Sequence, residues 1–420
     1  MSIGYACIAL GVQNAGFSRC SLKCASVEKI REVISINLSA LSNVIDYNIK
    51  NSIMLFRISS DIIPFGSHPI NTVDWQSEYK EELIEIGRKI ISSGMRVSMH
   101  PGQYTVINSN NPKVVENSIL DLEYHAAFLD SLGVDTKNKI IIHVGGLYGD
   151  KNNSIKVFLS NYSRLNDNVK KRLVLENDDK SYNIEDVLSI SNEIEIPVIF
   201  DNLHHKLNNI EPEHSDTFWI RQCDKTWKEK DGRQKVHYSQ QKTGFSNGAH
   251  SETILIDKFA KLYNEIIQEC LDCDIMLEVK DKNLSAVKCI NTCVLNCKVK
   301  ELEVEWARYK YYVLSKSSKL YDGIRKMMKE KNETSSLEFY NKIEEALFMQ
   351  GTRGSRVNAA EHIWGYFKKN HTTSEKKRYE KLITSYKDGS KKYDEVRNHL
   401  LKCAKRVDNQ YLINSLFFYI

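Results

Sequence analysis

The chain has 420 residues, of which 41% are hydrophobic and 27% are charged, and its formal net charge at pH 7 is +5. These proportions are ordinary for a soluble globular protein, and the length exceeds that of most single domains. No stretch approaches the ~20 consecutive apolar residues that a membrane-spanning helix needs, so we expect no membrane association.

The charge is divided unevenly along the chain. Residues 314–420 carry 22 Lys and Arg against 13 Asp and Glu, a net of +9, which leaves 37 against 41, or −4, for the first 313 residues. A basic C-terminal part tolerates polyanions such as nucleic acid, although runs of surface lysine are more often only solvated. Charge alone therefore leaves the partner of this part open.

The N-terminus and the cysteines bear on the cellular compartment. The first ten residues, MSIGYACIAL, lack a basic segment and lead directly into a strand-like pattern, so we expect no signal peptide. The ten cysteines show no regular pairing. In a chain of this size without an export signal, they predict free thiols and a reducing, cytoplasmic location.

Strands and helices alternate up to about residue 313. The predicted strands are Ile3–Ala9, Ile53–Ser59, Arg96–His100, Lys139–Val144, Arg172–Asn177, Ile196–Asn202, Lys235–Ser239 and Asp274–Lys280. The predicted helices between and after them are Val27–Ile49, Glu78–Ser93, Val114–Leu132, Asn153–Leu165, Ile184–Ile194, Ser251–Glu269 and Asn283–Tyr312. Eight strands, each followed by a crossover, predict an α/β fold of the (β/α)8 TIM-barrel type. A doubly wound open sheet is the alternative, but it would place its chemistry at one switch point rather than at most strand ends.

The alternation stops in the last hundred residues. Helices are predicted at Glu338–Met349, Val357–Lys369, Ser374–Ser385 and Tyr393–Lys405. We interpret residues 1–313 as the barrel domain, 314–335 as a basic linker and 336–420 as a small α-helical domain. Cys289, Cys293 and Cys297 follow one another at intervals of four on the last predicted barrel helix, and we interpret them as buried thiols on one helix face rather than as metal ligands.

Histidines and carboxylates stand at or just beyond the ends of six consecutive predicted strands. In chain order they are His100, His143, Glu176, Asp201 with His204, His237 with His250 in the following loop, and Glu278. The C-terminal strand ends of a barrel meet on one face, so these side chains can approach one another. Histidine and carboxylate without cysteine suit Mn, Zn or Fe, and the number of donors exceeds what one ion requires. The pattern predicts two or three ions that share carboxylates. We interpret His125 and His205 as structural.

Two further features adjoin these strand ends. Lys235 precedes His237 by two residues and shares its face of the strand. We interpret it as a salt-bridged core lysine, and the alternative is a lysine close to the metals that contacts phosphate or is carboxylated by CO2. His100 opens the turn His100-Pro-Gly-Gln-Tyr, in which Pro and Gly end the strand. The turn would present Gln103 and Tyr104 at the rim of the sheet.

These motifs resemble those of the ultraviolet-damage endonucleases of the UvdE/UvsE type. HPGQY, HVGGLYGDK, LENDD, FDNLHH, KVHYS and MLEVKDK occur in this order, and RISSDIIPFGSH fits the same pattern. The resemblance covers roughly residues 1–313. It implies a TIM barrel akin to endonuclease IV with a cluster of two to three divalent ions, usually Mn2+, with Mg2+, Zn2+ or Co2+ as alternatives. It also implies hydrolysis of the DNA backbone immediately 5′ to cyclobutane pyrimidine dimers, 6-4 photoproducts and some other lesions, abasic sites possible among them, by metal-activated water, which leaves a 3′-hydroxyl and a 5′-phosphate.

The resemblance also implies roles for individual residues. The implied metal ligands are His100, His143, Glu176, Asp201, His204, His237, His250 and Glu278. Glu176, Glu278, His237 and Lys235 would serve catalysis, and Gln103 and Tyr104 would probe the duplex and fill the gap left by displaced bases. Family members often carry Asn just after the first strand, where this chain has Leu10, with Asn14 further on.

The C-terminal part has a weaker likeness of its own. NAAEHIWGYFKK, which begins at Asn358, and Tyr411-Leu412 resemble a helical domain of the YbgA type, found alone or fused to DNA-repair proteins. That resemblance implies no mechanism and no partner. For the whole chain we expect a monomer that acts on ultraviolet-damaged double-stranded DNA.

Two other classes of function stay open. One is an abasic-site endonuclease or a sugar isomerase on the same barrel and metals, and the HPGQY turn argues against an isomerase because a sugar site has no use for a duplex wedge. The other is a binding protein without catalysis, which would leave the complete ligand set unexplained.

Overall fold

The computed structural model describes residues 1–209, 211, 213–329 and 335–420. The chain forms two compact units. The first comprises residues 1–254 and 261–287, and the second comprises residues 255–260 and 288–420.

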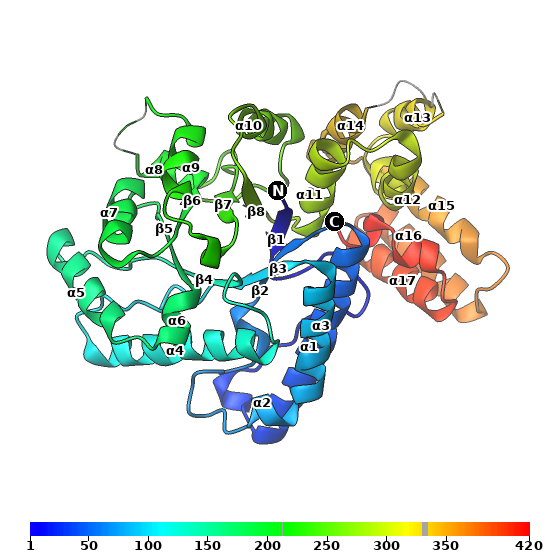
Figure 1. Cartoon of the computed structure of the whole chain (residues 1–420). Coiled ribbons are helices and arrows are strands. Elements are labelled where there is room, and N and C mark those ends of the chain that lie inside the picture. The colour runs from blue at the N-terminus through cyan, green and yellow to red at the C-terminus, as the bar shows by residue number, and fades with distance from the viewer. Residues whose placement is uncertain (210, 212, 330–334) are drawn as a thin grey trace. The chain divides into compact units, whose positions relative to one another are not determined.

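Eight parallel strands close into a barrel in the first unit (Figure 1). They are β1 (Ile3–Ala6), β2 (Leu55–Ile58), β3 (Arg96–Met99), β4 (Lys139–Ile142), β5 (Leu173–Glu176), β6 (Val198–Asp201), β7 (Gln234–Tyr238) and β8 (Cys273–Leu277). Each strand pairs with the next, and β8 closes the barrel on β1 by aligning Ile275 with Ile3 and Leu277 with Tyr5. The predicted TIM barrel is confirmed, although most strands are shorter than predicted, and the open sheet is excluded.

Both faces of the barrel strands are buried. This explains why their sequences are continuous apolar runs rather than alternating apolar and polar residues. All four residues of β4, with the sequence KIII, are buried. Helices such as α1, α3, α4, α5 and α7 lie outside the strands (Figure 1). The helices that begin within the first unit are α1 (Val27–Lys50), α2 (Trp75–Glu78), α3 (Lys80–Ser93), α4 (Pro112–Ser131), α5 (Lys151–Ser163), α6 (Asp167–Arg172), α7 (Ile184–Ile194), α8 (Asn202–Leu207), α9 (Asp216–Asp224) and α11 (Asn283–Cys289). α10 (Ile256–Gln268) begins in the second unit and continues into the first.

Local chemistry sets the N-terminus of α1 and the C-terminus of α3 where the sequence pattern predicts them, whereas α10 begins at Ile256 rather than at the predicted Ser251. Ser26 caps α1 by accepting a hydrogen bond of 3.1 Å from the backbone N–H of Lys29. α3 ends at Gly94, whose φ of 72° suits a residue without a Cβ. The apolar periodicity does not predict the short helices α6, α8 and α9. Each spans fewer than three turns, which is too short for a helical pattern of apolar residues to repeat.

The single helix predicted over Asn283–Tyr312 is wrong. α11 ends at Cys289, a π-helical turn follows over Ile290–Val294, and α12 (Val299–Lys316) begins only after a break. Asn296 adopts a left-handed conformation with φ of 45°, which interrupts a right-handed helix. The cysteines therefore do not form one row. Cys293 lies in the π-helical turn, and Cys297 lies in the break, where its thiol is 3.4 Å from Asn291 Oδ1.

The second unit is helical, as the sequence predicts for the C-terminal part. Besides α12 it contains α13 (Ser318–Met327), α14 (Ser336–Phe348), α15 (Arg353–Trp364), α16 (Thr373–Lys387), α17 (Tyr393–Arg406) and α18 (Gln410–Ile413). Its core gathers buried residues from α12, α15, α16, α17 and the last turns of the chain, among them Leu314, Ile363, Leu382, Leu400 and Phe417.

The predicted segment boundaries differ from this arrangement in detail. The predicted boundary at residue 313 falls inside α12, and much of the segment 314–335, predicted as a linker, is helical because it contains the end of α12 and all of α13. Residues 330–334 of that segment lie outside the described residues. The division into a barrel domain, a linker and a helical domain therefore stays a prediction.

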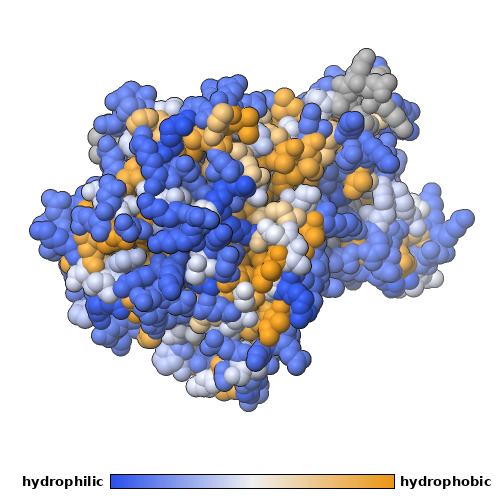
Figure 2. Space-filling model, in the orientation of Figure 1, coloured by the Kyte–Doolittle hydropathy of each residue, from blue (hydrophilic) through white to orange (hydrophobic). Residues whose placement is uncertain are grey.

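Two compositional predictions can be compared with the structure. All ten cysteines are free thiols, as predicted. In the part of the chain that the structure describes, no helix is both long and apolar enough to cross a membrane. Figure 2 shows a face on which hydrophilic residues predominate, with smaller apolar patches between them.

Candidate metal centre

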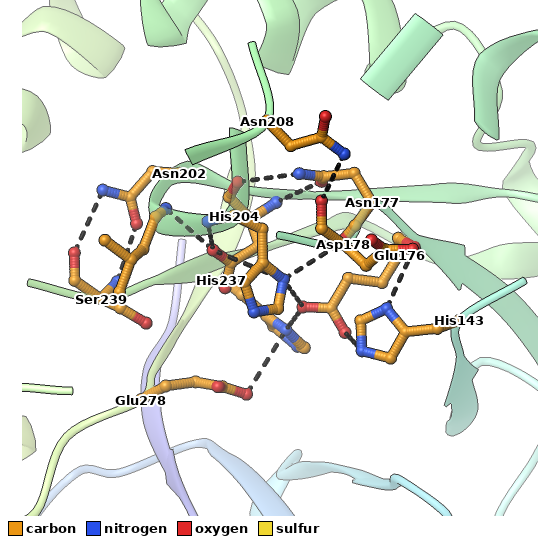
Figure 3. Close-up of polar contacts among 12 residues, drawn as sticks. His143, Glu176, Asn177, Asp178, Asn202, His204, Asn208, His237, Ser239 and Glu278 are labelled. Atoms are coloured by element: carbon orange, nitrogen blue, oxygen red, sulfur yellow. Dashed lines mark hydrogen bonds and ion pairs between the residues drawn. The ribbon is translucent and has the colours of Figure 1, made fainter. Parts of the chain in front are cut away.

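The predicted ligand residues lie at the C-terminal ends of the barrel strands, where Figure 3 shows several of them turned toward Glu176. Glu176 and Asp201 are the last residues of β5 and β6, and His237 lies in β7. His100, His143 and Glu278 directly follow β3, β4 and β8, His204 lies in the short helix α8, and His250 lies in the loop between β7 and α10. The barrel thus brings residues from six strands to one face.

The Glu176 carboxylate is the centre of this cluster. Its Oε2 lies 3.2 Å from His100 Nε2 and 3.5 Å from His143 Nε2. Its Oε1 lies 2.6 Å from His237 Nδ1 and 3.8 Å from His204 Nδ1. One buried carboxylate therefore contacts four imidazoles, which is far more than a structural hydrogen bond requires.

Three overlapping groups of donors have atoms within 4.8 Å of one another, and Glu176 belongs to each. The first adds His100 and His143, the second adds Asp201 and His204, and the third adds His237 and Glu278. His250 lies outside these groups, and its Nε2 is 3.8 Å from Glu278 Oε2. The structure brings together seven of the eight predicted ligands and places the eighth beside them.

The donor set has the chemistry of a divalent-metal site. His237 Nε2 and Asp201 Oδ2 are buried and, within the described part of the chain, have no hydrogen-bond partner. A buried polar atom without a partner costs about 1–3 kcal/mol, so two of them within one cluster call for a missing ligand. Imidazole nitrogens and carboxylate oxygens are ligands for Mn, Zn and Fe, and the residues therefore fit the predicted ions.

Electrostatics keeps the two glutamates ionised. Burial opposes ionisation of Glu176, but the charges of His237 and His143 and hydrogen bonds from His100 and His237 outweigh it and hold the pKa of this carboxyl well below its usual range. Burial likewise opposes ionisation of Glu278, and the ion pair with Arg57 lowers the pKa of Glu278 in spite of it. Both carboxylates are thus available as anionic ligands at neutral pH.

Asp201 and His204 behave differently. Burial raises the pKa of Asp201 to about 6. Burial works against the charge of His204, but Asp201, Glu176 and Glu278 overcome it and raise the pKa of His204 to about 9. His204 therefore carries a proton at neutral pH as long as no cation occupies the cluster.

We expect Mn2+ binding to release protons and to weaken as the pH falls. As a predicted ligand, His204 would have to give up its proton to the ion, so the apparent affinity should fall by about tenfold for each pH unit below pH 9 per proton displaced. Calorimetric titration of the metal-free chain at several pH values, in buffers of different ionisation enthalpy, measures both effects. A His204→Gln variant should lose this pH dependence, and an affinity that does not change with pH in the unmodified chain would contradict the expectation.

Two residues of the site were missed because their signals are weak in the sequence. Arg57 is an arginine within the apolar strand β2 and pairs with Glu278. Asn177 follows Glu176 directly, accepts a hydrogen bond of 2.9 Å from the Asp201 backbone N–H, and has its carbonyl oxygen 2.9 Å from His204 Nδ1. The inward-facing charge in an apolar strand was the one available sign of Arg57.

Lys235 lies in the barrel interior and is fully buried. The interpretation as a salt-bridged lysine is wrong, because its Nζ has neither a hydrogen-bond nor an ion-pair partner among the residues that the structure describes. Burial, and then the nearby charge of Arg96, lower the pKa of Lys235 well below its usual range. The side chain is thus an amine of reduced basicity, two residues from His237.

The HPGQY turn separates its two ends, as the sequence predicts. His100 contacts Glu176, whereas Gln103 and Tyr104 are exposed, and 70% of Tyr104 is accessible to solvent. A Cβ on Gly102 would lie 2.4 Å from Tyr104 Cε1, so a larger residue there would displace the exposed ring from this position. Tyr104 borders an open cavity of about 990 Å3.

A hydrogen-bond network supports this turn from below. Thr105 Oγ1 donates to Asp121 Oδ2 over 2.6 Å, and Ser67 Oγ donates to Asp121 Oδ1 over 2.8 Å. The Ser60 hydroxyl donates to the His100 carbonyl oxygen. The Asp121 carboxylate on α4 therefore connects Thr105, which follows the turn, to the loop that follows β2. These hydrogen bonds hold the backbone next to the exposed Tyr104 in place.

Comparison with known proteins gives the following matches. Residues 2–307 match the family model described as UV-endonuclease UvdE, and residues 310–420 match that of a protein of unknown function, DUF1722. The UV DNA damage endonuclease of Clostridium perfringens (strain 13 / Type A) is 41% identical over 417 residues, which cover 97% of each chain. That of Bacillus cereus (strain G9842) is 33% identical over 264 residues, which cover 63% of this chain and 83% of that one. The crystal structure of SacUVDE is 40% identical, with a TM-score of 0.65, over 72% of this chain and 99% of that one.

Proposed function

Because the chain belongs to the UV-endonuclease UvdE family, as its strand-end motifs predict, we propose that it is a DNA-repair endonuclease acting on ultraviolet damage. It hydrolyses the phosphodiester bond immediately 5′ to cyclobutane pyrimidine dimers and 6-4 photoproducts, with abasic sites as a further substrate, and leaves a 3′-hydroxyl and a 5′-phosphate. The observation that carries the proposal is the cluster of seven ligand-type side chains, in which Glu176 belongs to all three donor groups.

The proposed cofactor is a cluster of two to three divalent ions, Mn2+ first, with Mg2+, Zn2+ and Co2+ as alternatives. The residues that would hold it are His100, His143, Glu176, Asp201, His204, His237, His250 and Glu278. When bound, the ions supply Lewis-acid activation of water and of the phosphoryl group, and they stabilise charge on the attacking and leaving oxygens.

The chain's own residues prepare this chemistry. Arg57 keeps Glu278 ionised, and Asn177 orients Asp201 and His204, so the donors are held in place before a substrate arrives. Glu176, which belongs to all three donor groups, would be the carboxylate shared between the ions. Preorganised donors need no rearrangement during reaction, which is the main source of catalysis in such sites.

The proposed lesion probes are Gln103 and Tyr104. An amide and an exposed ring on a fixed turn can replace a stack that is lost when damaged bases leave the duplex, at a gain of about 1–3 kcal/mol per base–aromatic contact. Extrusion is easiest where a lesion has already weakened pairing, so damage is selected without sequence readout. The proposed partner is therefore ultraviolet-damaged double-stranded DNA, bound by a monomer.

Incision of a labelled duplex that carries one pyrimidine dimer tests the proposed function. Matched duplexes with one abasic site and with no lesion run beside it, each with Mn2+ and with chelator. We expect a cut immediately 5′ to the dimer that depends on the metal, weaker cutting at the abasic site and none in the undamaged strand. Equal cutting of all three duplexes would contradict damage recognition, and cutting in chelator would contradict metal dependence.

For Lys235 we propose a role next to the metals, either as a carboxylated lysine or as a contact to phosphate. Its buried amine lacks any partner in the described residues, which leaves it free to react with CO2 or to receive an anion. We expect native mass spectrometry to show an added CO2 that Lys235→Met abolishes, together with a loss of incision. An unmodified mass with full incision by Lys235→Met would leave the lysine a structural residue.

A further inference from the structure

The second unit contains a cavity that has no part in the proposed incision. Its volume is about 440 Å3, and residues of α12, α15, α16, α17 and the last turn of the chain line it. Four basic residues point to its chemistry: Lys316, Arg356, Lys392 and Arg397. One acidic residue, Asp394, lies among them. We call this cavity the C-terminal pocket.

The positive charge of the C-terminal pocket is not neutralised. Arg397 pairs with Asp394 over 2.9 Å and donates to the backbone oxygens of Phe417 and Ile420. Lys316, Arg356 and Lys392 have no acidic partner within 4.0 Å among the residues described. Burial, and then the charges of Arg356 and Arg397, lower the pKa of Lys316, which is what cations held together without a counterion do to one another. Three positive charges thus remain to be matched from outside the protein.

Aromatic rings hold two of these cations, Lys316 and Arg356, in place. The Lys316 ammonium lies 5.0 Å from the centre of the Tyr312 ring, and the Arg356 guanidinium lies 5.8 Å from that of Tyr393. Tyr393 Oη donates to the Arg356 carbonyl oxygen over 2.7 Å, and the Tyr386 and Tyr393 rings are 5.1 Å apart. Contacts with rings fix these two cations without cancelling their charge. Tyr312 and Tyr386 are buried and Tyr393 is partly exposed, so Tyr393 is the ring with surface left for a ligand.

We propose that the C-terminal pocket binds one phosphorylated nucleotide unit, either a free mononucleotide or the 5′-phosphorylated end of a DNA strand. Lys316, Arg356 and Lys392 take the phosphate, because guanidinium and ammonium groups make charge-assisted hydrogen bonds to its oxygens. The partly exposed ring of Tyr393 contacts the base, as aromatic side chains do in sites for single strands. A volume of about 440 Å3 lies in the range of small-ligand sites and excludes a duplex. This binding does not depend on the activity proposed for the barrel.

Calorimetric titration of the full chain, kept in chelator so that the barrel cannot bind phosphate through metals, tests the proposal. The probes are thymidine 5′-monophosphate, inorganic phosphate and thymidine. We expect the monophosphate to bind at least about tenfold more tightly than either of the others, because only it engages both the cations and the rings. No binding of the monophosphate, or equal binding of inorganic phosphate or of thymidine, would overturn the proposal.

Substitutions in the pocket test where the monophosphate binds, and a second pocket variant controls for misfolding of the first. The double variant Lys316→Gln/Arg356→Gln should bind the monophosphate at least about tenfold more weakly, whereas Lys405→Gln, on the exposed face of α17, should bind it as the unmodified chain does. Because Arg356 packs on tyrosine rings, Lys392→Gln at the exposed rim serves as a second variant and should weaken binding by a smaller factor. Unchanged affinity in both pocket variants would overturn the assignment.

A short single strand, with and without a 5′-phosphate, distinguishes the two sources of the ligand. Tighter binding of the phosphorylated strand than of the mononucleotide supports a strand end, and tighter binding of the mononucleotide supports a free nucleotide. A strand that binds equally well with and without its 5′-phosphate, and better than the mononucleotide, would contradict the pocket and indicate general affinity for polyanions.

Discussion

Glu176→Gln is expected to abolish incision while damaged DNA still binds. The amide keeps the size of the side chain but removes the anionic donor common to all three donor groups, so the proposed ions would lose their shared ligand. We expect the incision rate to fall on the order of 10³-fold, as when a preorganised electrostatic contact is removed from an active site. The dissociation constant for a dimer-containing duplex should stay nearly the same, because Gln103 and Tyr104 are untouched.

Single-turnover incision and fluorescence anisotropy with the same duplex measure the two quantities separately. Glu193→Gln is the matched control, since it makes the same substitution on the exposed face of α7 and should cut at the normal rate. Normal incision by Glu176→Gln in saturating Mn2+ would remove the residue from the proposed centre.

The opposite phenotype is expected when Gln103 and Tyr104 are both replaced by alanine. Loss of the ring alone should weaken binding of damaged duplex by about 1–3 kcal/mol, which is roughly 5- to 150-fold in the dissociation constant. Metal binding should not change, because His100 at the other end of the turn keeps its contact with Glu176.

Conversely, His100→Ala should impair metal loading and incision but leave recognition of damage in place.

Anisotropy with damaged and undamaged duplexes, beside a Mn2+ titration, measures both halves of this separation. Tyr104→Phe is the control, since it keeps the ring and should bind as the unmodified chain does. Equal loss of affinity for damaged and undamaged duplex in the double alanine variant would contradict a role in damage recognition and would mean that the turn contacts DNA of either kind.

The barrel and its strand ends could be predicted because each rests on a local signal. A parallel strand buried on both faces is a short apolar run, and the residue that ends it is visible directly, as with His100 before Pro101 or Asp201 before α8. That all these ends converge follows from barrel closure. Barrel closure does not determine which of these side chains contact one another, because loop geometry sets those contacts. His250, for example, lies beside Glu278 rather than within a donor group.

Other features left little or no readable sign in the sequence, because they depend on backbone conformation or on contacts between distant residues. The break between α11 and α12 depends on Asn296 in a left-handed conformation, which apolar spacing does not register. The ion pair of Arg57 with Glu278 joins β2 to the end of β8, far apart in the chain. The missing partner of Lys235 is a property of packing, so the sequence pattern favoured a salt bridge that the structure does not contain.

Anomalous diffraction from crystals grown with Mn2+ shows whether Glu176 is shared by a cluster of metal ions at the mouth of the barrel. We predict two or three anomalous peaks at this site, with Glu176 bound to at least two of the ions, and loss of those peaks in Glu176→Gln. A single peak, or peaks that do not contact Glu176, would contradict this prediction.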